Sequence, residues 1–433
     1  MTQSDTFSDL PKPRKLKAVT VPPGMGGVLN LAAAIGPALD GSGPAIVPIP
    51  TGPPAVVDQI LAALKPDQPE FPIESNEIAI VCATSGSTGA PRGVLLTQDA
   101  LIKSAAAFGN RFGTDNRWVI SMPAHRIAGI MVLVRSWLHG SPFEIDPSVG
   151  GARPFEAAAF AATTMRAKRL SNADGRALMV SLVPTQIARL LDAGKVGLET
   201  LQTYDLILSG AAATPQPLLK RLRDEGVNVA VSYGMSETCG GCVFDGQPID
   251  GVSISIGTQD DVEPGRISIS GPVIASGYRL RPDLDSLSFI DHRLVTQDVG
   301  KLDSHGLLHV LGRLDDVVIV GGVNVALSAI ESIIRHHPMI SDVAIIDIAD
   351  ELWGSLPVAY VVTRSHDQNT YELEQEIRQV VSNQIGRAAT PRRIRFVNQL
   401  PMLDSGKIDR ISLRLQAATD ITEGRMTHPG SVN

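Results

Sequence analysis

Along the first half of the chain, short runs of apolar and β-branched residues alternate with longer segments whose apolar positions recur every three to four residues. Runs of the first kind are typical of buried strands, and segments of the second kind of amphipathic helices. Strands are expected at 77–82, 178–183, 205–210 and 227–231, and helices at 99–108, 185–191 and 216–225. Because parallel strands need crossover helices between them, this alternation predicts an α/β fold with a largely parallel sheet covered by helices on both faces.

The pattern changes twice further along the chain. Short strands separated by Gly and Asp turns are expected at 252–256, 266–269 and 307–310, as in a small antiparallel β subdomain. After Leu314, strands are expected at 317–320, 343–348, 358–362 and 394–397, and helices at 328–336 and 371–385. These elements predict a compact α+β domain. We therefore expect an N-terminal domain over residues 1–313 and a small mobile C-terminal domain over 314–433, with residues 1–25 and the tail after Ala418 poorly ordered.

Composition excludes several classes of protein. The 433-residue chain has a net charge of −7, and its Lys and Arg residues are scattered, which argues against a nucleic-acid partner. No apolar run reaches the roughly 20 residues that a membrane helix needs, and residues 1–20 contain no apolar signal core. Three cysteines fit a reducing compartment. We expect a cytoplasmic protein without membrane insertion, and a homodimer is one open alternative for its oligomeric state.

Two of the cysteines, Cys239 and Cys242, are spaced as C-x-x-C. A structural zinc site needs a second pair of ligands at similar spacing, and the sequence has none. A redox motif would be expected in a short thioredoxin-like context, which is also missing. We interpret the pair as two ordinary thiols in a Gly-rich strand and turn.

A stretch rich in glycine and hydroxyl residues directly follows the strand at 77–82. Its candidate ligand residues are Thr84, Ser85, Gly86, Ser87, Thr88, Gly89 and Arg92. Glycines let backbone N–H groups approach an anion, hydroxyls add donors, and an arginine supplies positive charge. Neither G-x-x-x-x-G-K-[ST] nor G-x-G-x-x-G is present. The stretch therefore predicts a phosphate-binding loop of another kind, whereas a shorter match would favour a flexible turn.

A second motif, Tyr233-Gly234-Met235-Ser236-Glu237-Thr238, follows the strand at 227–231. A tyrosine ring can stack on adenine, a hydroxyl can bond the α-phosphate, and a carboxylate can hold Mg²⁺. Taken alone, a Tyr-Gly pair after a strand is usually only the end of that strand. Its position after the phosphate loop favours a functional interpretation.

These motifs resemble those of the adenylate-forming acyl-CoA synthetases. The family's loop usually has Lys at the position of Arg92, and its Y-G-x-T-E motif has Thr at the position of Ser236. Three later stretches also resemble family motifs: 296–300 resembles T-G-D, 312–316 resembles G-R-x-D-D, and 401–410 resembles P-x-x-x-x-G-K-[IV]-x-R. The resemblance covers nearly the whole chain.

The resemblance implies an enzyme that uses ATP and Mg²⁺ to convert a carboxylic acid to its acyl-adenylate and then passes the acyl group to coenzyme A. It implies catalytic roles for Lys407, Ser236, Glu237 and Arg92, and Mg²⁺ contacts for Glu237 and Thr88. It implies ATP or AMP binding by Thr84, Ser85, Gly86, Ser87, Thr88, Gly89, Gly210, Ala211, Tyr233, Gly234, Asp298 and Arg313. It also implies that Asp315 is a hinge about which the C-terminal domain rotates between the two half-reactions.

Three stretches, 121–129, 181–186 and 209–213, resemble the o-succinylbenzoate–CoA ligases of menaquinone biosynthesis. That family often has two adjacent histidines where this chain has His125-Arg126. Candidates for binding the acid are His125, Arg126, Thr185, Arg189 and Ser209, and for Arg189 an exposed helix position is an equally good interpretation. Two alternatives stay open: a ligase that uses another aryl or medium-chain acid or a carrier protein, and a non-catalytic nucleotide-binding sensor.

Overall fold

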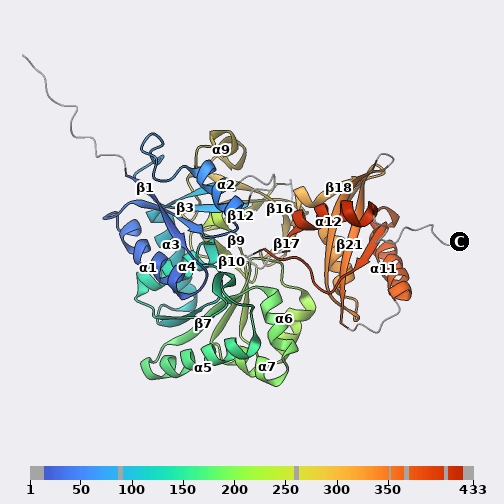
Figure 1. The fold of residues 1–433 in the computed structure, drawn as a ribbon, viewed down its shortest axis with the longest axis horizontal. Helices are drawn as coiled ribbons and strands as arrows, with labels where there is room; N and C mark the ends of the chain where they lie inside the picture. Colours follow the sequence, from blue (N-terminus) through green and yellow to red (C-terminus); the bar gives the residue numbers. More distant parts are fainter. Residues whose placement is uncertain are drawn as a thin grey trace, which may run out of the picture. The chain divides into compact units, whose positions relative to one another are not determined.

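The structure is a computed structural model that describes residues 14–85, 91–257, 263–350, 353–364, 370–403 and 408–422. The chain divides into two compact units (Figure 1). The first unit comprises Met1–Thr214, Arg221–Ile254 and Ile269–Val295, and the second comprises Pro215–Lys220, Ser255–Ser268 and Thr296–Asn433. The last passage of the chain from the first unit to the second lies within one strand, β16 (Arg293–Leu302).

The first unit contains a mixed sheet with the strand order β1-β2-β3-β4-β14. Its parallel strands are β1 (Leu16–Val21), β2 (Ala45–Pro50) and β3 (Ile78–Ser85), and its antiparallel strands are β4 (Pro91–Thr97) and β14 (Gly277–Tyr278). Every residue of β2 is buried, as expected of a parallel strand covered on both faces. Helix α2 (Pro54–Leu64) packs against β2 and β4.

A second sheet has the strand order β11-β10-β9-β8-β7-β5-β6. Its parallel strands are β5 (Asn116–Ile120), β6 (Phe143–Ile145), β7 (Ala177–Leu182), β8 (Leu206–Ser209) and β9 (Val229–Met235). β10 (Gly240–Phe244) and β11 (Gln247–Pro248) are antiparallel additions at one edge. Helix α8 (Gln216–Asp224) separates β8 from β9 in the chain.

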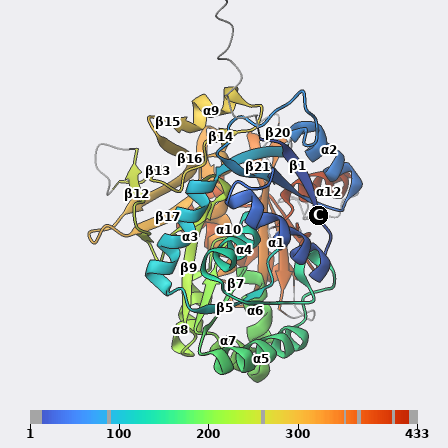
Figure 2. The ribbon, with the colours of Figure 1, turned by 90° about the vertical axis from the view of Figure 1, so that its left-hand side faces the viewer.

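Helices cover these two sheets in layers. α1 (Met25–Leu39) packs on β1–β3, α4 (Ile127–His139) packs on β5 and β10, and α3 (Gln98–Phe112) contacts both helices, so these three lie between the sheets (Figures 1 and 2). α5 (Ala157–Asp174) contacts β5–β7 and α7 (Lys195–Gln202), which packs on α6 (Pro184–Asp192). The predicted α/β fold class, with parallel strands covered by helices on both faces, is confirmed.

The structure differs from the expectations at three places. Residues 16–21 form β1 instead of a disordered start, because the Arg14 guanidinium donates hydrogen bonds to the carbonyls of Gly43 and Ile78 and fastens this end of the chain. Between the Gly-rich stretch and α3 the chain forms β4, a strand that was not expected and that pairs antiparallel with β3. The chain remains helical for four residues beyond Ala418, because α12 spans Arg410–Thr422.

The expected small β subdomain is a third sheet with the strand order β12-β13-β16-β15, in which β17 also pairs with β16. Its strands are β12 (Ser253–Ile256), β13 (Gly265–Ser270), β15 (Phe289–Ile290), β16 and β17 (Leu308–Arg313). Helix α9 (Pro282–Ser288) lies between β14 and β15 in the chain.

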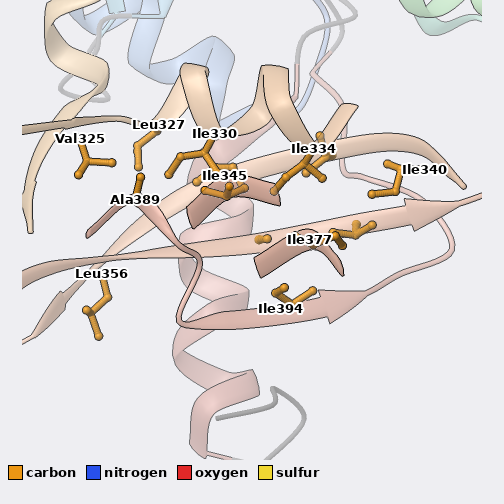
Figure 3. Packing of buried hydrophobic residues seen from close by; sticks show 14 of the residues in the cluster. Val325, Leu327, Ile330, Ile334, Ile340, Ile345, Leu356, Ile377, Ala389 and Ile394 are labelled. Carbon is orange, nitrogen blue, oxygen red and sulfur yellow. The ribbon is translucent and has the colours of Figure 1, made fainter. Parts of the chain in front are cut away.

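The second unit ends in an α+β sandwich built on a fourth sheet. The sheet contains β18 (Val317–Val320), β19 (Val323–Ala326), β20 (Ile340–Asp350), β21 (Gly354–Thr363) and β22 (Arg393–Phe396). Along β20, Val343 and Ile345 face a core shared with α10 (Leu327–Arg335) and α11 (Thr370–Ile385), as Figure 3 shows for Ile345 with Ile330, Ile334 and Ile377. The alternate residues Ala344 and Ile346 face α12 on the other side.

Arg279 is the first unit's most heavily bonded buried cation among the described residues. Its guanidinium donates to the carbonyls of Leu64, Phe71 and Pro72 and to Glu74 Oε2, at 2.7 to 2.9 Å. Its side chain has no exposed surface. Arg279 therefore holds the end of β14 against the segment that follows α2.

We expect Arg279→Ala to lower the free energy of unfolding of the first unit by about 3–5 kcal/mol, because it breaks a buried ion pair and leaves the carbonyls without donors. Urea unfolding followed by the fluorescence of Trp118, which is buried in this unit, measures the change. Arg281→Ala is the matched control, because Arg281 forms only an exposed ion pair with Asp283 and should contribute less than about 1 kcal/mol. Equal effects of the two substitutions would contradict the structural role of Arg279.

Candidate active site

The Gly-rich stretch lies where two antiparallel strands join. Ser85 and Thr84 at the end of β3 pair with Pro91 and Arg92 at the start of β4. Thr84 Oγ1 donates to the Arg92 carbonyl oxygen at 3.4 Å. The intervening candidates Gly86, Ser87, Thr88 and Gly89 lie outside the described residues. Thr84 and Arg92 thus stand on opposite arms of the predicted phosphate loop, which we call the phosphate hairpin (residues 84–93).

The second arm of this hairpin leaves no room for a side chain at Gly93. A Cβ there would lie 2.5 Å from Leu64 Cδ2 and 2.7 Å from Val81 Cγ1. The Gly93 carbonyl also accepts a hydrogen bond from the Arg279 backbone N–H at 2.8 Å. The last glycine of the motif is therefore required by packing, whatever else the hairpin binds.

The second motif forms the end of β9 and a 3₁₀ turn over Ser236–Thr238. The Thr238 hydroxyl holds this turn, because it accepts from the Met235 N–H at 2.9 Å and donates to the Gly240 carbonyl at 2.7 Å. β10 then returns so close to β9 that a Cβ on Gly234 would lie 2.0 Å from the Gly240 oxygen. The glycine of this motif is thus required by the close pairing of β9 with β10.

This turn brings Ser236 and Glu237 to the phosphate hairpin. Ser236 is buried, and its Oγ lies 3.7 Å from Sγ of Cys82 on β3. The Tyr278 hydroxyl, on β14 beside β4, donates to Glu237 Oε1 at 2.8 Å. Burial and the Glu237 charge raise the pKa of Tyr278, while the Arg92 charge acts in the opposite direction. Tyr278 therefore keeps its proton at neutral pH and can donate it in a hydrogen bond to Glu237.

Sequence reasoning missed Tyr278 and the capping role of Thr238. Thr238 could have been found, since a hydroxyl two or three residues after the end of a strand often caps a turn. Tyr278 carries no such local signal, because its partner Glu237 is 41 residues away in the sequence.

Most of the remaining candidates follow the carboxyl ends of parallel strands. β5, β7, β8 and β9 run parallel to one another, so their carboxyl ends meet at one edge of the sheet, where α/β proteins bind ligands. His125 and Arg126 follow β5, Thr185 follows β7, and Ser209 ends β8. Gly210 and Ala211 come next, and Ala211 has a left-handed φ of 63°.

The candidates for the acid pocket differ in their surroundings. Ser209 is fully buried, and its Oγ lies 2.8 Å from Thr214 Oγ1. His125 is buried, whereas Arg189 is exposed on α6. Burial raises the pKa of Cys82 to about 11, and the Arg126 charge acts in the opposite direction. Arg126 lies at the N-terminus of α4, and Cys82 contacts Ser236.

In the second unit, Asp298 and Arg313 lie together. They are register partners on β16 and β17, and Arg313 Nη1 donates to Asp298 Oδ1 at 3.1 Å. The Asp298 N–H donates to Thr296 Oγ1 at 3.0 Å. Gln297, at the position where the family has Gly, is exposed on the opposite face of the strand. The substitution thus leaves the Asp298 side of β16 unchanged.

The residues expected to move lie further along the same unit. Asp315 belongs to a short 3₁₀ turn, Leu314–Asp316, between β17 and β18. Gly321 and Gly322 join β18 to β19 with φ values of 57° and 83°, positive angles that glycine adopts without strain. Lys407 lies outside the described residues, and a bridge between Met402 and Ile408 spans its position in the chain.

Cys239 and Cys242 are free and buried. Burial raises the pKa of Cys242 to about 12 and that of Cys239 as well, so both are thiols at neutral pH. Over the described ranges, no three His, Cys, Asp or Glu side chains gather as metal ligands. In the same part of the chain, no helix is long and apolar enough to cross a bilayer.

Comparisons with known proteins match most of the chain. The model of the family described as AMP-binding enzyme matches residues 40–279, and that of the AMP-binding enzyme C-terminal domain matches residues 329–407. The probable 2-succinylbenzoate–CoA ligase of Mycobacterium tuberculosis (strain CDC 1551 / Oshkosh) is 35% identical, over 92% of this chain and 97% of its own. The 2-succinylbenzoate–CoA ligase of Bacillus pumilus is 28% identical, over 81% of this chain and 71% of its own length.

Solved structures share the fold. The o-succinylbenzoate CoA synthetase of Bacillus subtilis, in complex with its acyl-adenylate intermediate, is 24% identical with a TM-score of 0.69, over 93% of this chain and 88% of its own. ATP-bound MatB from Rhodopseudomonas palustris is 21% identical with a TM-score of 0.73, over 96% of this chain and 98% of its own. The first family model spans more than half of this chain, and the resemblance in its motifs is confirmed. The chain belongs to the family of AMP-binding enzymes.

Proposed function

We propose that this chain is an ATP-dependent acid–CoA ligase that forms an acyl-adenylate and then a CoA thioester, with 2-succinylbenzoate as its acid. The observation that carries the proposal is the meeting of the phosphate hairpin with the Ser236–Glu237 turn, through Cys82 on β3 and Tyr278 beside β4. Family membership supports the reaction. The relative that is 35% identical over 97% of its length, named as a probable 2-succinylbenzoate–CoA ligase, supports the acid.

In the first half-reaction, the substrate carboxylate attacks the α-phosphorus of ATP in line, and pyrophosphate leaves. A carboxylic acid is already ionised at neutral pH, so the reaction needs positioning and charge stabilisation and no general base. Arg92 and the hairpin bind the departing phosphates, and the Ser236 hydroxyl donates to the α-phosphate. Lys407 stabilises the charge that develops between the carboxylate and the α-phosphate.

Glu237 suits a magnesium ion. Mg²⁺ is usually bound through one or two carboxylates together with nucleotide phosphates and water, which a single well-placed glutamate satisfies. Glu237 Oε1 accepts a hydrogen bond from the Tyr278 hydroxyl, and the further lone pairs of the carboxylate would hold the ion. When bound, the ion would neutralise charge on the phosphates. We assign Thr88 as a second contact of the same ion.

The proposed nucleotide site is divided along the chain. Gly210, Ala211 and Tyr233 bind the adenine, and Asp298, oriented by Arg313, binds the ribose hydroxyls. We propose domains at 1–313 and 314–433, a division that places all of these residues in the N-terminal domain.

In the second half-reaction, the C-terminal domain rotates about Asp315, withdraws Lys407 and presents the Gly321–Gly322 turn. The thiol of coenzyme A then attacks the acyl carbon and AMP leaves. The position of Asp315 in a short turn between two strands supports a hinge there. The partners are thus small soluble molecules, which supports a cytoplasmic location, and a homodimer is compatible with this mechanism.

The proposal is tested by ATP–pyrophosphate exchange across a panel of aryl, dicarboxylic and medium-chain acids. We expect 2-succinylbenzoate to support exchange at least about tenfold faster than the others, equivalent to about 1.4 kcal/mol. Preference for another acid would change the substrate, and a carrier protein that replaces coenzyme A would change the acceptor. Absence of exchange with every acid would favour a nucleotide-binding sensor.

We expect Lys407→Ala to slow adenylate formation about 10²- to 10³-fold, as for removal of one charge-stabilising donor. Thioester formation from preformed adenylate should change less than about threefold, because Lys407 is withdrawn in that step. Rapid-quench measurements of each half-reaction separate the two effects. Lys195→Ala, at an exposed position on α7, is the matched control. Equal losses in both half-reactions would contradict domain alternation.

Among the acid-binding candidates, Arg126 is a charged residue that follows β5, at the edge where the carboxyl ends of the parallel strands meet. We expect Arg126→Ala to raise the KM for the acid about 10- to 100-fold, as for loss of a charge-assisted hydrogen bond, and to leave the KM for ATP unchanged. Steady-state kinetics with each substrate varied in turn measure this. Arg169→Ala, at an exposed position on α5, is the control. A larger effect of Arg189→Ala would transfer the role to that residue.

A further inference from the structure

The Tyr278 hydroxyl joins two segments of the first unit that the proposed mechanism uses separately. It donates to Glu237 Oε1 at 2.8 Å, and its own strand β14 pairs with β4, the second arm of the phosphate hairpin. Tyr278 is only 5% exposed, so water does not compete freely for this hydrogen bond. The contact therefore ties the carboxylate to the hairpin arm.

The backbone around Tyr278 is fixed from both sides. Its N–H donates to Asp285 Oδ1 at 2.7 Å, and its ring lies 5.5 Å from that of Phe289. The next residue, Arg279, is held by the buried hydrogen bonds described above. The backbone N–H of Ala275 donates to the Glu237 carbonyl at 2.8 Å, so the same segment holds Glu237 by main chain and side chain. The phenol thus has a fixed position from which to orient the carboxylate.

We propose that Tyr278 is the positioning residue for the magnesium-binding carboxylate of Glu237, a proposal that rests on the function given above. The Tyr278 hydroxyl donates to Oε1 and so holds the carboxylate in one orientation, in which its remaining lone pairs would bind the ion. Partners of this kind orient metal ligands in many sites, and their removal typically weakens metal binding 10- to 100-fold.

The test compares Tyr278→Phe with the wild-type protein. Phenylalanine keeps the ring packing against Phe289 and removes only the hydroxyl. Tyr204→Phe is the matched control, because Tyr204 is also buried and its hydroxyl lies 2.7 Å from Thr164 Oγ1, in a contact that includes no candidate site residue. The affinity for Mn²⁺, as a probe for Mg²⁺, is measured by electron paramagnetic resonance with ATP present and the acid omitted, so that no turnover is needed.

We expect Tyr278→Phe to weaken Mn²⁺ binding at least about tenfold and Tyr204→Phe to leave it unchanged, although both lose a buried hydroxyl. In steady-state exchange, the Mg²⁺ concentration for half-maximal rate should rise with Tyr278→Phe, while the KM for the acid stays constant. Glu237→Gln should abolish the difference between Tyr and Phe at position 278, because the two residues act on the same ion.

The outcomes separate this inference from the function on which it rests. Wild-type affinity for Mn²⁺ in Tyr278→Phe would overturn the positioning role and leave the ligase proposal intact. Equal losses in Tyr278→Phe and Tyr204→Phe would overturn it too, since they would reflect stability alone. A wild-type protein that binds no Mn²⁺ with ATP and exchanges no pyrophosphate would overturn the proposed function itself.

Discussion

The arrangement of the first unit's candidate site depends on one buried cation. The Arg279 guanidinium has no access to water, so its charge is stabilised only by Glu74 and by three backbone carbonyls. A cation in such a place would be very costly without these partners. With them, β14 is fixed beside β4, and Tyr278 and Arg92 are held on neighbouring strands. An interaction that has no part in the chemistry thus determines where Glu237 finds its hydrogen-bond donor.

The second sheet contributes to the site through the direction of its strands. The four neighbouring parallel strands β5, β7, β8 and β9 all end at one edge of the sheet, and the loops that follow them lie there. Residues more than 100 positions apart in the sequence therefore come together at this edge without long-range side-chain pairing. Packing around two glycines then determines how closely the neighbouring segments approach the site. Gly234 admits the returning strand β10, and Gly93 admits Leu64 and Val81. Glycines that a sequence comparison would assign to phosphate binding alone are thus also required by packing.

The sequence predicted the elements whose signal is local. Hydrophobic period predicted four strands and three helices of the first half and the elements of the C-terminal α+β domain, and these are present in the structure. It did not reveal the parallel strands β2, β5 and β6 or the helices α1, α2, α4 and α5. It did not predict β1, because the order of that strand depends on Arg14 reaching carbonyls about 24 to 64 residues away. It did not predict β4 either, since its pairing with β3 depends on a hairpin in a segment that is rich in Gly and Pro. Tyr278 was missed for the same reason: its role exists only through a contact across the fold.

Three substitutions relative to the family's motifs can be explained physically from the structure, and together they support the assignment of those motifs. Gln297 is on the exposed face of β16, where strand alternation separates it from Asp298. Ser236 is buried beside Cys82, where a hydroxyl fits, and it lacks only the methyl group of the usual Thr. Arg92, in place of Lys, keeps a positive charge on β4, and this charge lowers the pKa of Tyr278 against the effects of burial and of Glu237. A planar guanidinium offers donors in more than one direction, so Arg92 can bind a phosphate while its charge still acts on Tyr278. The least typical residue of the hairpin is therefore compatible with the role that the motif implies.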